Sequence, residues 1–65
     1  MMTISIGTMI EQVGGLSYPD QLTAFENGFV QVIIKRYHEE KKDTRWMSET
    51  HIEIIDSIWR KHFAA

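Results

Sequence analysis

The sequence predicts an all-α fold: an antiparallel helical hairpin with a short N-terminal helix, dimerising into a helical bundle. Apolar residues recur at helical spacing in three separate segments. Residues suited to a helix N-cap stand at the start of each segment. One proline and four glycines in 65 residues leave few points at which a long helix would be interrupted. We therefore expect a single domain over residues 1–65, with helices at about 5–13, 18–42 and 48–63.

The first helix is predicted from apolar residues at positions i, i+3, i+4 and i+7, which share one helix face. These residues are Ile6, Met9, Ile10 and Val13. Thr3 or Ser5 can cap the start of this helix. Gly14 or Gly15 can end it. Apolar and polar residues also alternate at its beginning, so the sequence leaves two alternatives for residues 3–8, a helix or a short strand.

The second helix is predicted to begin near Ser17. Ser17 and Asp20 have capping-box spacing, and Pro19 suits the first turn of a helix. We expect this helix to extend through Lys41 and Lys42, whose charges suit the negative end of the helix dipole. The β-branched run "FVQVII" could form a strand in isolation, but the caps and the length of the pattern favour a helix.

This second helix carries an unusually broad apolar sector. The line along its centre contains Leu22, Phe25, Phe29 and Ile33. The residues that widen it are Val30, Val32, Ile34 and Tyr37. At about 100° per residue the sector spans roughly 200°, about twice what a surface helix needs.

The third helix is predicted to follow Ser48, a favourable N-cap, with Glu49 in its first turn. Its apolar positions again cover almost half of the helix. They are Ile52, Ile54, Ile55, Ile58, Trp59 and Phe63. The connection "KDTRWM" is short, which makes the two long helices antiparallel neighbours.

The two long helices thus offer more apolar surface than a hairpin can bury. The short first helix covers only part of the excess, and with no cysteine the chain has no disulfides to stabilise it. We expect a homodimer to cover the remainder, because a two-fold pair is the commonest oligomer. The predicted core and interface residues are Leu22, Phe25, Phe29, Val32, Ile33, Ile55, Ile58, Trp59 and Phe63.

Three residues of the second helix interrupt its apolar sector. Glu26 and Arg36 either lie at the sector edge with their charges in water, or pair across the dimer axis and fix its register. Gly28 either kinks the helix or allows another helix to approach closely, and we favour close approach.

No catalytic, cofactor or metal site is predicted. His51 and His62 are eleven residues apart, about 16 Å along a helix, so one helix cannot place both on one metal. The acidic pairs are expected on solvated helix faces, where nothing perturbs either carboxylate. We therefore do not expect an enzyme.

A nucleic-acid contact is the alternative. Lys41, Lys42 and Arg45 cluster at the turn between the long helices. However, Asp43 and other acidic residues lie among them, and the net charge of the chain is −2. A DNA-binding module usually has a clearly basic face. No apolar run is long enough to span a membrane and no signal peptide is apparent, so we expect a cytoplasmic protein.

Residues 21–59 resemble the small accessory proteins encoded in the early region of lambdoid temperate phages. The resemblance implies an early phage protein, helical and dimeric, that acts in the host cytoplasm on host physiology or on the choice between lysis and lysogeny. It assigns no functional residues. The expected function is a non-enzymatic interaction or regulatory module with an unidentified protein partner; the alternative is a small DNA-binding transcriptional regulator.

Overall fold

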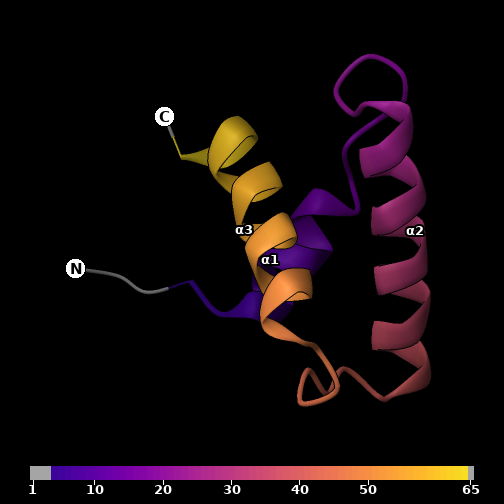
Figure 1. Ribbon diagram of the computed structural model, residues 1–65, viewed down its shortest axis with the longest axis vertical. Coiled ribbons are helices and arrows are strands. Elements are labelled where there is room, and N and C mark those ends of the chain that lie inside the picture. Colours follow the sequence, from indigo (N-terminus) through magenta and orange to yellow (C-terminus); the bar gives the residue numbers. More distant parts are fainter. Residues whose placement is uncertain (1–3, 65) are drawn as a thin grey trace.

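The computed structural model describes residues 4–64, which form three helices and no strand: α1 (Ile6–Val13), α2 (Ala24–Glu39) and α3 (Glu49–Phe63). The predicted all-α class is confirmed. α2 and α3 run in opposite directions, and α1 packs against both of them (Figure 1). The two long helices make fewer close backbone contacts with each other than with α1. α1 therefore connects the two long helices, which do not by themselves form the closely packed hairpin predicted.

α1 begins after Ser5, whose hydroxyl accepts a hydrogen bond from the Thr8 backbone N–H at 3.2 Å. Of the two predicted caps, Ser5 is the one used, while Thr3 lies outside the described residues. The strand alternative is wrong from Ile6 onward. Ile10 and Val13 are buried, at 1% and 0% exposure, so the predicted apolar face of this helix does enter the core.

α2 begins at Ala24, six residues later than predicted, because Thr23 and not Ser17 is the N-cap. The Thr23 hydroxyl accepts from the Glu26 N–H at 3.1 Å, and the Glu26 carboxylate accepts from the Thr23 N–H at 2.9 Å. This reciprocal pair is a complete capping box. Ser17 instead closes a turn, since its carbonyl accepts from the N–H of Gln21 at 2.9 Å.

The end of α2 also differs from the prediction, which extended the helix to Lys42. The helix ends at Glu39, and Lys41 and Lys42 have positive φ values of 55° and 66°. This left-handed backbone cannot continue a right-handed helix. The Lys42 N–H turns back to donate to the Tyr37 carbonyl at 2.7 Å, which satisfies one of the last carbonyls of the helix.

α3 begins as predicted, after Ser48. The Ser48 hydroxyl accepts from the His51 N–H at 3.3 Å, and His51 Nδ1 accepts from the Ser48 N–H at 3.1 Å. This is a capping box with an imidazole in the place usually held by Glu or Gln. The acceptor role of Nδ1 requires the neutral imidazole to carry its proton on Nε2.

One apolar core connects all three helices. Its buried members are Ile10, Val13, Leu22, Val30, Ile33, Tyr37, Met47, Ile55 and Ile58. Two glycines, one within α1 and one at its C-cap, let α2 approach closely. A Cβ atom on Gly14 would overlap the Ile34 side chain, and one on Gly7 would lie 2.8 Å from the Tyr37 hydroxyl. The missing side chains therefore determine how near α1 and α2 can lie.

Shortening Ile10 tests whether α1 is central to the core. Ile10→Ala is expected to lower the free energy of unfolding by about 2–5 kcal/mol, because it removes buried methyl groups and leaves a cavity. Ile52→Ala makes the same change at a position that is 39% exposed, and is expected to have a much smaller effect. Urea unfolding followed by circular dichroism measures both. Equal losses in the two variants would contradict a core centred on α1.

The position of the α2 cap is tested by two matched substitutions. Thr23→Ala is expected to destabilise the protein by about 0.5–2 kcal/mol, because it leaves the Glu26 N–H without its side-chain acceptor. Ser17→Ala, at the predicted but unused cap, is expected to have a smaller effect. Thermal unfolding of the two variants gives the comparison, and the reverse order would place the cap at Ser17.

Candidate interaction surface

The outer face of α2 carries an exposed apolar line. Phe25 and Val32 are each 67% exposed, and Phe29, between them, is half-buried. These three residues lie at i, i+4 and i+7, so they form one line, called here the α2 apolar stripe. Gly28 lies beside the stripe, and a Cβ atom there would meet nothing within 4 Å. Figure 1 shows α2 at the edge of the molecule, away from the side on which α1 and α3 pack.

An aromatic row supports the inner edge of the stripe. The ring of Phe25 stacks on Phe29 with 6.1 Å between centroids, and Phe29 lies 6.0 Å from the ring of His51. His51 in turn lies 6.0 Å from Trp46, and the Arg36 guanidinium lies over the Trp46 ring at 4.9 Å. The row links α2 to the start of α3, so packing restrains the aromatic part of the stripe.

A groove of about 330 Å³ lies next to the stripe, between the start of α2 and the middle of α3. Phe25, Ile54 and Ile58 supply apolar walls, and Glu26 and Glu53 supply acidic groups. The Glu26 carboxylate bridges the two helices, because Lys61 donates to it at 3.2 Å. This bridge holds α3 near the amino-terminal end of α2.

Glu26 is engaged entirely within the chain. The pKa of its carboxyl is lowered, chiefly because it accepts the Thr23 N–H and also because Lys61 lies beside it, while burial opposes this shift. Arg36 is likewise engaged, over Trp46. Both groups therefore have intrachain partners, which favours the sector-edge interpretation over the alternative of a Glu26–Arg36 pair across a dimer axis.

The predicted core and interface residues separate into three sets. Leu22, Ile33, Ile55 and Ile58 are buried within the single chain. Phe29 and Trp59 are half-buried. Phe25, Val32 and Phe63 are exposed. Trp59 donates to the Gln12 side chain at 2.6 Å, and Phe63 stacks on Trp59. α1 therefore covers much of the inner surface, and what remains exposed lies mainly on α2, with a smaller area at the end of α3.

Two large apolar residues outside the predicted core and interface set are also exposed, Tyr18 at 51% and Ile52 at 39%. Tyr18 lies in the turn before α2, where helical spacing carries no information. Ile52 lies on the predicted stripe of α3, but at its outer edge, and the signal for its exposure was the neighbouring Glu53 and Glu49.

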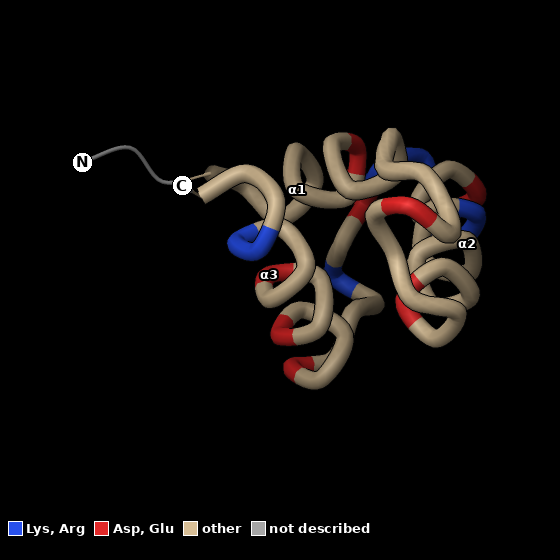
Figure 2. Tube along the Cα trace, turned by 90° about the horizontal axis from the view of Figure 1, so that it is seen from above, with Lys and Arg blue, Asp and Glu red and all other residues tan. Residues whose placement is uncertain are grey.

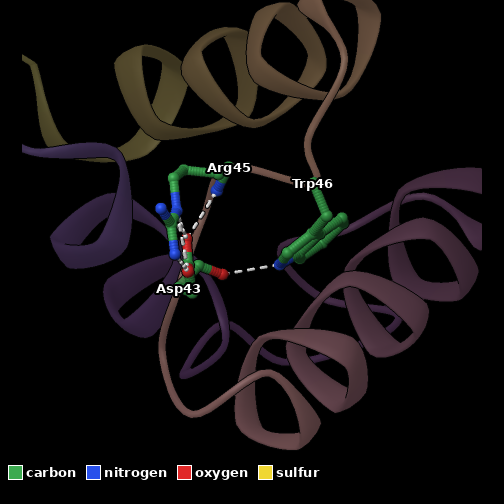
Figure 3. A network of polar contacts seen from close by, with 3 residues as sticks. All are labelled: Asp43, Arg45 and Trp46. Atoms are coloured by element: carbon green, nitrogen blue, oxygen red, sulfur yellow. Dashed lines mark hydrogen bonds and ion pairs between the residues drawn. The ribbon is translucent and has the colours of Figure 1, made fainter.

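The turn at residues 41–45, called here the basic turn, carries less uncompensated positive charge than its composition indicates. Arg45 folds back onto Asp43, with 2.6 Å between Nη2 and Oδ2 (Figure 3). This contact lowers the pKa of the Asp43 carboxyl to about 2. The Trp46 indole N–H donates to the Asp43 carbonyl and closes the same turn. Among residues 4–64, Lys41 and Lys42 form no ion pair, so they are the two cations of the predicted nucleic-acid contact that stay uncompensated.

A second groove, of about 320 Å³, lies between α1 and α2. Glu11, Tyr37 and His38 line it together with the two glycines at the end of α1. Burial, assisted by the Glu11 carboxylate, raises the pKa of the Tyr37 hydroxyl. The phenol therefore stays protonated at neutral pH.

Within residues 4–64, no three His, Asp or Glu side chains gather in a way that could hold a metal ion. No helix in the same range has the length and apolar content to cross a membrane. Comparisons of the chain with protein-family models, curated proteins and solved structures found no match.

The lowered pKa of Glu26 predicts a pH-dependent contribution to stability. Because the folded pKa lies below the ordinary value of 4.5, this contribution is complete above that value and is lost as pH falls through the folded pKa. Glu26→Gln is expected to be less stable than the original chain at pH 7, with a difference that shrinks towards pH 3. Urea unfolding at several pH values measures it. Glu39→Gln, which removes an exposed charge at the other end of α2, is the control; a constant difference for Glu26→Gln would contradict the assignment.

Proposed function

We propose that this chain is a non-enzymatic protein-interaction module that binds a protein partner through the α2 apolar stripe. The observation that carries the proposal is the 67% exposure of both Phe25 and Val32 on one line of α2. Complete burial of such a side chain is worth about 1.5–3 kcal/mol. A contiguous apolar surface left in water is typical of an interaction site.

The organisation of the surface supports the same proposal. The stripe is presented by a helix with a complete capping box, and Phe29 is fixed by packing against His51. A surface ordered before binding loses little conformational entropy when it binds. Aromatic and arginine side chains are also the types that most often dominate binding energy, and Arg36 lies at the end of the stripe, over Trp46.

The interactions of the basic turn favour a protein partner over a nucleic acid. Asp43 compensates Arg45, and although Lys41 and Lys42 form no ion pair among the described residues, the neighbouring Glu39 and Glu40 lower the local positive charge. Binding to a duplex depends on cations that neutralise phosphates. In the setting that the resemblance to phage accessory proteins implies, a module that binds a protein through this stripe would act as a regulator.

Photo-crosslinking in cells tests the proposal. A photoreactive phenylalanine analogue at position 32 is expected to form an adduct of defined mass with a protein, because Val32 lies in the stripe. The control places the same analogue at position 50, where Thr50 is exposed on α3, and is expected to give no such adduct. Mass spectrometry identifies the crosslinked chain. No adduct from position 32, or equal adducts from both positions, would contradict the proposal.

A duplex-binding experiment tests the alternative directly. The chain is expected to leave duplex DNA unshifted in gel electrophoresis at about 0.15 M salt, where non-specific phosphate contacts are weakened. Retardation that falls steeply with salt and disappears in a Lys41→Ala, Lys42→Ala variant would instead identify a DNA-binding function.

A further inference from the structure

We infer that the partner on the α2 apolar stripe is the same stripe of a second copy, with the two α2 helices antiparallel and crossing at Gly28. This inference rests on the proposed function, because it names the occupant of the same surface. It assigns the homodimer a specific contact, a specific direction and a residue at its centre.

Gly28 indicates where the helices cross. It lies in the interior of α2, where glycine is less favourable than alanine by about 1 kcal/mol. Nothing within the chain requires the missing side chain, since a Cβ atom there would meet nothing within 4 Å. Its φ is not positive, so backbone conformation does not require glycine either. What the position offers is bare backbone beside Phe25 and Val32, which allows a second helix to approach closely.

The order of large and small residues along the stripe is self-complementary. In a two-fold contact, residue i of one copy meets residue j of the other, and the reverse contact is identical. A two-fold axis between residues 28 and 29 places Phe29 over Gly28 of the second copy. The same axis places Phe25 against Val32 of the second copy. Each large side chain thus faces a smaller residue, as close packing requires.

Charge selects the antiparallel direction. The carboxyl-terminal half of α2 carries Lys35 and Arg36, whereas Asp20 precedes the helix and Glu53 lines the groove beside its start. Figure 2 shows the acidic residues of α3 on the side of that helix that lies away from α2 in this view, so of these residues Glu53 contributes only through its place at the groove. An antiparallel pair brings Lys35 and Arg36 of each α2 towards Asp20 and Glu53 of the other, while Glu39 lies beyond them at the last position of the helix. A parallel pair would place like charges together, which is unfavourable.

The expected contact is modest in size. α2 has 16 residues, so it is about 24 Å long. A standard interface buries about 800 Å² on each partner, about one sixth of the 4652 Å² that this chain exposes. One helix face with the adjoining groove lies at or below that size. We therefore expect a reversible dimer whose population depends on concentration.

Sedimentation velocity over a concentration series, with the full chain, tests the inference. The expected mass rises from 7.6 kDa towards twice that value. Val32→Glu and Gly28→Gln are each expected to weaken dimerisation at least tenfold, since one places a charge in the contact and the other fills the crossing point. Thr50→Glu, the matched charge on the exposed side of α3, is expected to leave it unchanged. Circular dichroism confirms that each variant folds, and Gly28→Gln is expected to keep full helicity.

A charge exchange tests the direction of the pair. Lys35→Glu and Asp20→Lys are each expected to weaken their own homodimer, and an equimolar mixture is expected to restore association. A parallel pair would leave each homodimer unaffected by these single changes, which would overturn the antiparallel assignment. A chain that stays at 7.6 kDa at every concentration while position 32 crosslinks to a different protein would overturn the self-association and leave the proposed function standing.

Discussion

The packing of α1 against both long helices is the constraint on which the rest of this fold depends. An isolated helix of eight residues is not stable in water, so α1 exists because Ile10 and Val13 are completely covered. In return, α1 supplies the closest approach to α2, where Gly7 and Gly14 leave room for Tyr37 and for Ile34. The dependence is mutual. The long helices stabilise α1, and α1 in turn determines how closely it and α2 pack.

This arrangement also determines which apolar residues stay in water. α1 contacts the side of α2 that carries Ile33 and Tyr37, and those side chains are buried. α1 is half the length of α2 and lies on one side only, so it cannot reach Phe25 or Val32, which point to the opposite flank. The exposed stripe is therefore a direct consequence of a broad apolar sector and a short covering helix.

The sequence was sufficient for the helix class, because helical spacing and caps are local signals. It was less reliable at the start of α2, because two pairs of residues within ten positions have the spacing of a capping box and only one of them forms it. Ser17 and Asp20 were selected, but Thr23 and Glu26 have the same spacing with a carboxylate long enough to reach back to the cap. A glutamate three residues after the N-cap is therefore the feature that distinguishes the cap at Thr23 from the unused one at Ser17.

The candidate surface could be predicted only in part, for a different reason. That α2 has more apolar surface than one hairpin needs follows from its sequence alone, and Phe25, Phe29 and Val32 were selected on that basis. Which of the nine predicted residues would be covered depends on where α1 lies. That position depends on contacts between residues twenty or more positions apart, such as Gly14 with Ile34. The contact of Arg45 with Asp43 likewise depends on the geometry of the turn, and that geometry cannot be deduced from the composition.

Folding and association are coupled in a chain of this size. A domain of about 60 residues buries only about 60% of its unfolded surface, so its stability is marginal. A partner that binds only the folded state adds to that stability by an amount that grows with the logarithm of its concentration relative to its Kd. His51 connects the two processes, because its imidazole closes the capping box of α3 and also packs against Phe29 of the stripe. A partner that covers the stripe would therefore also contact a side chain that holds the start of α3, and the side chains that add little to the stability of the isolated chain would stabilise the complex.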